Sequence, residues 1–262
     1  LWETNPANPD QRQARWVAWH EQEAADAERL TLWFTMDFHL GRVIEARPND
    51  PALYRRRADP RAEMGRWAEA GADLARAIEL DAGDPRPWFK DAQVRLKLGD
   101  LPGYRKDCAA MVERFGRETN PVPGLLTAWT CVLAPEAVAD PGQAVRLAEQ
   151  AVQAFPGDVK SLQTLGAALY RAGRWADAVQ RLTEAAAGPD EAGNAWDWLF
   201  LAMAHQQLGH REEARKWLNQ AEHWLNQTAL EEAQGRRQRM PWYQRLELEV
   251  LRQEGERGVS SP

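Results

Sequence analysis

The chain has 262 residues and a formal net charge of −6, so it has no excess positive charge with which to neutralise a nucleic-acid backbone or attract an anionic bilayer. Apolar residues make up 44% of it and charged residues 27%, as in folded globular proteins and unlike disordered ones. Its two cysteines, Cys108 and Cys131, lie in apolar helical patterns where a thiol acts as a small hydrophobe, so a structural disulfide is not favoured.

Residues 1–16 precede the regular pattern and are expected to form an N-terminal extension. They lack the basic and apolar regions of a signal peptide, and no segment approaches the ~20 apolar residues that span a bilayer. The chain also begins with Leu1 and not with Met. We therefore expect a piece of a longer protein, with a cytoplasmic location.

From residue 17 onward a helix-turn-helix pattern recurs with a period of about 34 residues. The sequence of residues 65–70, GRWAEA, returns almost unchanged as GRWADA at 173–178. Two further glycine turns, at Gly99 and Gly209, each fall about one period beyond these. After each turn, a small or aromatic residue is followed four places on by an apolar one, as in Ala178 and Leu182. This spacing predicts pairs of antiparallel helices stacked in series.

Small residues stand where paired helices are expected to come closest. The second helices of the pairs carry Ala70, Ala144, Ala178 and Ala214, and the first helices carry Gly166 and Ala202. Small side chains at these places let two backbones approach while larger neighbours fill the space between pairs. Each turn glycine is expected to end a first helix in a left-handed conformation that other residues adopt only with strain.

We expect six helix pairs, at residues 17–50, 51–84, 85–118, 125–158, 159–192 and 195–228. The first pair is the least regular, because Thr31-Leu32-Trp33 stands where a glycine turn is expected. The fourth contains a long turn from Pro135 to Pro141. Pro60, in the first helix of the second pair, should remove a backbone hydrogen bond. It predicts a kink there, or a late helix start capped by Asp59.

The end of the chain is expected to close the array. Residues 229–240 are predicted to form a loop, 241–257 a capping helix and 258–262 a tail. Trp242, Leu246 and Val250 recur every four residues on one face of that helix, as needed to cover the last apolar face. The acidic stretches 21–28 and 247–256 alternate with Arg and Ala and indicate solvated helix faces.

These patterns are identified as tetratricopeptide repeats. Leu162-x2-Leu165-Gly166-x2-Leu169 and Trp198-x2-Leu201-Ala202-x2-His205 match the signature W-x2-L-G-x2-Y in spacing and mostly in residue size. The resemblance implies an all-α fold, a right-handed α-α superhelix (a solenoid) of about six helical-hairpin repeats plus a C-terminal capping helix. It also implies a scaffold that binds a protein or peptide and carries out no catalysis.

Several strings further resemble bacterial, especially planctomycete, repeat modules that are often fused to a serine/threonine kinase domain or a β-propeller. Among them are FHLGR at 38–42, GYRKDCAA at 103–110 and WDWLFLAMAH at 196–205. This resemblance covers nearly the whole chain and implies an architecture and not a particular activity. It leaves open a second function, an intramolecular regulatory or assembly segment of such a larger protein.

The family resemblance places the partner-binding residues on the first helices, which line the concave face of such arrays. At the corresponding positions this chain has Arg55, Phe89, Gln93, Trp129, Gln163, Tyr170, Leu199, Met203 and Gln206. The middle of this surface is aromatic and apolar with polar edges, which suits an extended or helical peptide. The alternative is that Phe89, Trp129 and Leu199 pack against adjacent helices. The Lys and Asn pairs that clamp a C-terminal carboxylate in some related arrays are missing.

No sequence motif indicates catalysis or metal binding. The sequence lacks phosphate-binding glycine loops, nucleophile elbows and the H-E-x-x-H pattern. Its five histidines show no His-x3-His pair, and no Cys-x2-Cys pair is present. We therefore expect no metal, no cofactor and no enzyme activity. Nucleic acid and membranes are not expected partners, an RNA-binding repeat being disfavoured by the negative charge, and no feature specifies an oligomeric state.

Overall fold

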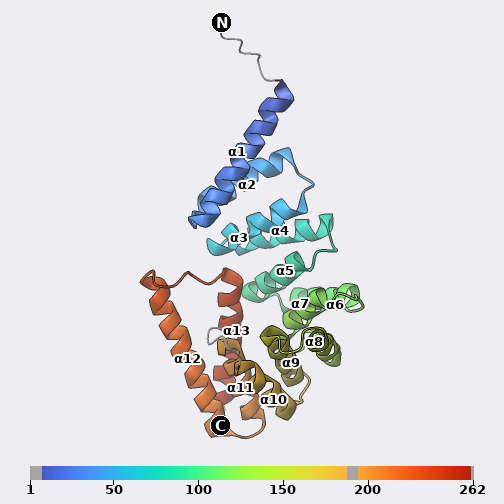
Figure 1. Ribbon diagram of the computed structural model, residues 1–262, viewed down its shortest axis with the longest axis vertical. Coiled ribbons are helices and arrows are strands. Elements are labelled where there is room, and N and C mark those ends of the chain that lie inside the picture. Colours follow the sequence, from blue (N-terminus) through green and yellow to red (C-terminus); the bar gives the residue numbers. More distant parts are fainter. Residues whose placement is uncertain (1–7, 188–193, 261–262) are drawn as a thin grey trace. The chain divides into compact units, whose positions relative to one another are not determined.

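The computed structural model describes residues 8–187 and 194–260 and forms α-helices with connecting turns (Figure 1). Within these ranges the chain has thirteen helices, which confirms the expected all-α repeat fold. It divides into two compact units, Leu1–Leu98 and Gly99–Pro262. The division falls inside the expected third helix pair, 85–118.

The N-terminal unit contains five helices, each packed against the next. They are α1 (Pro9–Arg29), α2 (Trp33–Ala46), α3 (Pro51–Glu63), α4 (Trp67–Leu80) and α5 (Pro85–Leu98). The first of them begins within the stretch 1–16 that was expected to be an extension. Its start follows from the local sequence, because the Asn8 side chain accepts a hydrogen bond from the Asp10 amide and Pro9 needs no partner for its nitrogen.

The C-terminal unit contains eight helices. They are α6 (Leu101–Phe115), α7 (Pro121–Val132), α8 (Gly142–Ala154), α9 (Val159–Arg171), α10 (Trp175–Ala186), α11 (Asn194–Gln207), α12 (Arg211–Ala233) and α13 (Trp242–Ser260). Helices α7, α9 and α11 lie side by side, and α13 packs against α11 and α12. Cys108 and Cys131 are buried in this unit as free thiols.

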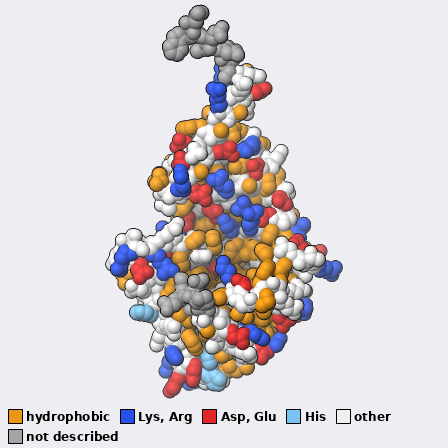
Figure 2. All heavy atoms as spheres, viewed as in Figure 1, with side chains coloured by type: hydrophobic (Ala, Val, Ile, Leu, Met, Phe, Trp, Pro, Cys, Tyr) orange, Lys and Arg blue, Asp and Glu red, His pale blue; other side chains and the backbone are white. Residues whose placement is uncertain are grey.

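The described parts of the chain contain no helix that is both long and apolar enough to cross a membrane. Basic and acidic side chains are interspersed over the face seen in Figure 2, with apolar ones between them. This mixed surface matches the absence of a strong charge bias in the sequence.

The turns between paired helices share one backbone geometry. Gly65, Gly173 and Gly209 have φ between 74° and 78°. In each case the next amide reaches back to close the turn, as from Arg174 to the Leu169 carbonyl at 2.9 Å. Thr31 adopts φ 54° at the corresponding place, and the Leu32 amide donates to the Ala27 carbonyl at 2.8 Å. The first helix pair therefore makes the same turn with a β-branched residue, which is strained there.

Thr31→Gly is expected to stabilise the N-terminal unit by up to about 1 kcal/mol, because glycine adopts a positive φ without steric cost while adding some freedom to the unfolded chain. Thermal unfolding followed by circular dichroism measures the change. Thr31→Ala keeps the Cβ and should bring no such gain. Equal melting temperatures for the Gly and Ala variants would contradict the strain at this turn.

Two paired helices approach closely at Gly166. A Cβ placed on it would lie 2.5 Å from Leu182 Cγ and 3.2 Å from the Leu182 backbone nitrogen. Leu182 is fully buried, as are Ala178, Ala202 and Ala214 at other expected close-approach positions. The small residues therefore set the spacing of the helix pairs, as the sequence predicted.

Gly166→Ala is expected to destabilise the C-terminal unit by roughly 1–3 kcal/mol, since the added methyl must push Leu182 and its helix away. Calorimetric unfolding checks the result. The matched control is Gly41→Ala in α2, where the nearest neighbour would be the tip of Arg57 at 3.7 Å. That change should be neutral or slightly stabilising, because alanine favours helix over glycine. A neutral Gly166→Ala would show that the helix pair adjusts its spacing freely.

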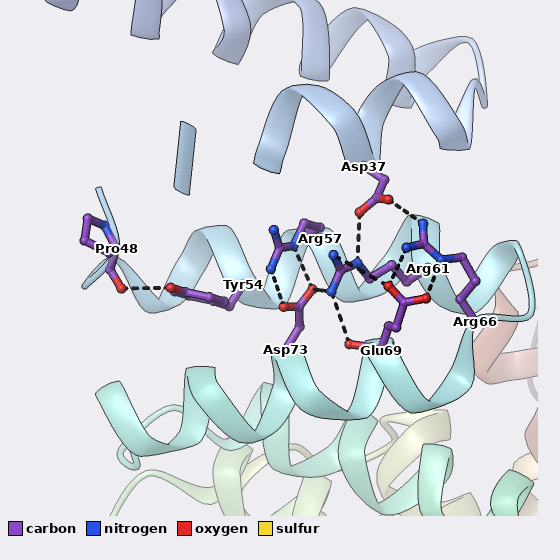
Figure 3. A network of polar contacts seen from close by, with 8 residues as sticks. All are labelled: Asp37, Pro48, Tyr54, Arg57, Arg61, Arg66, Glu69 and Asp73. Carbon is purple, nitrogen blue, oxygen red and sulfur yellow. Dashed lines mark hydrogen bonds and ion pairs between the residues drawn. The ribbon is translucent and has the colours of Figure 1, made fainter. Parts of the chain in front are cut away.

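The late helix start predicted from Pro60 is wrong. Helix α3 begins at Pro51, capped by the Asp50 side chain, and continues through Pro60 to Glu63. Ion pairs bind α3 to its neighbours through Arg57, before Pro60, and Arg61, after it. Figure 3 shows both arginines with their partners. Arg57 makes a two-pronged contact with Asp73 at 2.7 and 2.9 Å, and Arg61 contacts Asp37 and Asp73, both at 2.9 Å. These contacts join α2, α3 and α4 and offset the one backbone bond that Pro60 removes.

Candidate interaction surface

Hydrogen bonds and an ion pair join α13 to the neighbouring helices α7, α9 and α11 in the C-terminal unit. These three are first helices of expected pairs and lie next to one another. Helix α13 is in contact with all three through hydrogen bonds or packing. The expected capping helix therefore lies over the first-helix surface that was expected to face a partner.

Glu247 joins α13 to two of these helices. One carboxylate oxygen accepts a hydrogen bond from Trp129 Nε1 of α7 at 3.1 Å, and the other accepts from Trp196 Nε1 of α11 at 3.0 Å. The residue is only 5% exposed. Indole N–H groups can only donate, so a buried acceptor between them must be supplied by the opposing helix.

Glu254, seven residues further on, meets Arg171 at the end of α9. The two guanidinium Nη atoms donate to its two oxygens at 2.5 and 2.7 Å. Arg171 Nε also donates to the Val132 carbonyl at 2.8 Å, and its guanidinium lies over the rings of Tyr170 and Phe200 at 5.3 and 5.7 Å. Contacts with residues of α7, α9 and α11 thus orient the Arg171 guanidinium so that it can bind both oxygens of a carboxylate.

Helix α13 packs against α11 and α12 at Gly255. A Cβ placed on Gly255 would lie 3.8 Å from Met203 Cγ and 3.7 Å from Leu218 Cδ1. Met203 is 3% exposed and Leu199 is fully buried. Two of the residues expected to face a partner are therefore covered in this structure.

The other expected residues of the C-terminal unit are partly accessible. Trp129, Gln163, Tyr170 and Gln206 are half-buried. Burial, with Glu254 as a second cause, raises the pKa of Tyr170 to about 12, so its hydroxyl stays protonated and can donate. Two of these residues lie at the contacts with α13: Trp129 donates to Glu247, and Tyr170 lies under Arg171, which pairs with Glu254.

The expected residues of the N-terminal unit take part in local packing. Arg55 lies 3.6 Å from Asp84 in an ion pair, Phe89 is half-buried and Gln93 is fully buried. Lys90 Nζ donates to the two carboxylate oxygens of Asp59 at 2.6 and 2.7 Å. Arg55 and Asp59 are therefore already engaged within their own unit.

Sequence reasoning missed Glu247, Glu254 and Arg171. The stretch 247–256 was predicted to be a solvated face, and for Glu247 this is wrong because the residue is buried against two tryptophans. The available signal was the seven-residue spacing of the two glutamates, about two helical turns, beside the apolar face of α13. Arg171 lies 83 positions from Glu254 in the sequence, and Trp129 lies 118 positions from Glu247. A local sequence pattern cannot reveal pairs so far apart.

An open groove of about 850 Å³ lies beside the Arg171–Glu254 pair. The turn from Pro135 to Pro141 forms one wall, and Tyr170, Trp175 and Gln207 line the other parts. Arg105 secures the turn by donating to the Glu136 carbonyl at 3.1 Å and to its carboxylate at 2.8 Å. Glu136 itself has φ 55°. The long turn noted in the sequence thus builds a groove next to the end of α13.

Asp197 of α11 is a buried carboxyl. It has no exposed surface, and neither carboxylate oxygen has hydrogen-bonding geometry to a donor among residues 8–187 and 194–260. Burial raises its pKa to about 7, and the nearby Gln163 side chain offsets part of the rise. The same ranges contain no group of three or more His, Cys, Asp or Glu side chains able to hold a metal.

Asp197→Asn is expected to raise the free energy of unfolding above pH 7 by about 2–4 kcal/mol. The unfolded carboxyl ionises near pH 4, but the folded one stays protonated up to about pH 7, so the native chain loses stability as the pH rises between these values. The gain of the variant should shrink as the pH falls to 4. Denaturant unfolding across this range measures it, with the exposed Asp177→Asn as control. A pH-independent difference would contradict the raised pKa.

Comparisons with known proteins agree with this architecture. Residues 137–191 match the model of the tetratricopeptide repeat family. This match identifies a tetratricopeptide repeat within residues 137–191. No curated protein sequence matches the chain.

Solved structures share the fold at low sequence identity. A tetratricopeptide repeat protein from Parabacteroides merdae is 9% identical, with 94% of this chain and 90% of that one covered and a TM-score of 0.60. PilW, a type IV pilus biogenesis factor, is 14% identical, with 82% and 98% covered and a TM-score of 0.57. PilF of Pseudomonas aeruginosa is 12% identical, with 80% and 92% covered and a TM-score of 0.53. These likenesses concern the fold alone.

Proposed function

We propose that the chain is a non-catalytic protein-interaction scaffold that binds a helical or extended polypeptide on its first-helix surface. The observation that supports this most directly is the way α7, α9 and α11 hold α13. Trp129, Trp196 and Arg171 present N–H donors to α13, and Met203 contacts α13 at Gly255. Tryptophan and arginine are the side chains that contribute most to protein interfaces.

The chemistry of the surface selects its partner. Indole and guanidinium groups donate hydrogen bonds and accept none, so a well-matched polypeptide supplies carboxylates. Recognition rests on these local donors, because the chain as a whole has a net charge of −6 and would not attract an acidic partner over a long range.

A second candidate is a regulatory or assembly segment of a larger kinase or β-propeller protein. Large apolar side chains exposed on α1, α2 and their connection favour it: Trp16, Trp19, Leu30, Leu32, Phe34 and Phe38, which are 40–74% exposed. Such a patch commonly marks an interface. A kinase or propeller domain encoded next to this chain would support the candidate, and unrelated flanking sequence would argue against it.

The scaffold function can be tested by selecting 20-residue peptides from a display library on the full chain and measuring their Kd by fluorescence anisotropy. A Trp129→Phe, Arg171→Gln variant should bind the selected peptides at least about 10-fold more weakly, because it loses an indole donor and a charge-assisted bidentate contact.

The matched control is Arg181→Gln, which changes an exposed arginine paired with Glu184 on α10, and it should leave Kd unchanged. Circular dichroism confirms that each variant folds. If the library yields no binder, or if a folded double variant binds every selected peptide as tightly as the parent chain, the proposed surface is wrong.

A further inference from the structure

Helix α13 has the contacts of a bound ligand. Two of its glutamates, Glu247 and Glu254, stand seven residues apart, about two turns and 10 Å along one face of the helix. Both are received by donors on other helices of the repeats, namely Trp129, Trp196 and Arg171. Gly255 follows the second glutamate directly and lies against Met203, where an added Cβ would be 3.8 Å from Met203 Cγ. The pattern is carboxylate, carboxylate and small residue at positions i, i+7 and i+8.

The receiving side is organised by contacts that do not involve α13. Arg171 keeps its hydrogen bond to the Val132 carbonyl and its place over the Tyr170 and Phe200 rings. Trp129 lies edge-on to Phe200 with ring centroids 6.4 Å apart, and Trp196 lies at the same distance from Trp224. A surface held in this way remains ready for another helix, which lowers the entropic cost of binding it.

An irregular segment joins α13 to α12 and contacts α12, for example through the Met240 amide and Glu232 at 2.9 Å. Residues 234–241 connect it to α12 without helical structure and are mostly exposed, and Gly235 within them has φ 66°. On its other side, α13 leaves a cavity of about 280 Å³ against α12, lined among others by Leu225, Leu248 and Arg252. Displacement of α13 breaks its packing against α11 and α12, including the buried side chains Trp242, Leu246, Leu248 and Leu251. It leaves the hydrogen bond from Arg171 to the Val132 carbonyl in place.

We propose that α13 is an intramolecular pseudo-ligand, and that the surface beneath it binds a partner helix carrying two carboxylates two turns apart followed by a small residue. This inference rests on the proposed function and names both its partner class and its regulation. The tethered helix acts at an effective concentration on the order of millimolar for a short linker. The apparent affinity of a partner then equals its intrinsic affinity multiplied by the fraction of chains in which α13 is displaced.

The test uses a fluorescent peptide that copies residues 241–260 and two versions of the full chain. One is the natural chain, and the other carries Glu247→Ala and Glu254→Ala, which weaken its own α13 while leaving the receiving side unchanged. The peptide should bind the double variant at least 10-fold more tightly than the natural chain in anisotropy titrations. A peptide with the same two alanines should bind both chains at least 10-fold more weakly than the parent peptide.

The control peptide carries Glu256→Ala, since Glu256 pairs with Arg252 inside α13, and should bind like the parent peptide. Equal Kd for both chains, or equal binding with and without the two glutamates, would overturn the proposal. The proposal would also fail if light scattering showed that the double variant forms a dimer and that this dimer does not bind the peptide. The surface beneath α13 would then be occupied by a second copy of the chain.

Hydrogen exchange of the natural chain gives an answer even if the double variant fails to fold. The α13 amides should exchange faster than those of α9 and α11, by a route that leaves these two helices protected. If α13 exchanges only together with them, it is a permanent part of the fold and the proposal fails. The peptide in these experiments is the chain's own segment, so their failure leaves the library selection as a separate test of the scaffold function.

Discussion

A helical hairpin buries its apolar side only when another helix covers it, and this requirement shapes both compact units. Small residues at the crossing points set how closely the helices of a pair approach, as Gly166 does against Leu182. Stacked pairs then cover one another, and the last pair needs a helix that continues no repeat. In the C-terminal unit α13 takes this part, packed against α11 and α12.

The covering helix does more than exclude water. A purely apolar helix would be enough to cover the last apolar face. Helix α13 also places Glu247 between two indole donors and pairs Glu254 with the Arg171 guanidinium. Buried carboxylates are costly unless they are hydrogen-bonded, so these contacts set the register and direction of the helix more than they add stability. The geometry that orients a cap in this way is also the geometry that recognises a ligand helix.

The repeats could be predicted residue by residue, while the partner-facing surface could be predicted only as a set of positions. Turn glycines and crossing alanines are local signals, and even the turn at Thr31 follows the same hydrogen-bond pattern as its glycine counterparts. Leu199 and Met203 are buried, and Met203 lies against Gly255 of α13, about fifty residues further along the chain. Helix α3 does not start late at Pro60, because it is capped at Asp50 and ion pairs from Arg57 and Arg61 support it around the proline.

By itself the sequence determined the helices, their turns and the close approach within each pair, since these depend on backbone hydrogen bonds and side-chain sizes a few residues apart. Only the tertiary structure decided where α13 lies, which of its glutamates are buried, and that Asp197 is buried with a raised pKa. Those outcomes depend on groups 51 to 118 positions apart meeting in space, as Trp196 and Trp129 meet Glu247. No local periodicity encodes such a meeting, because stacking and burial create it.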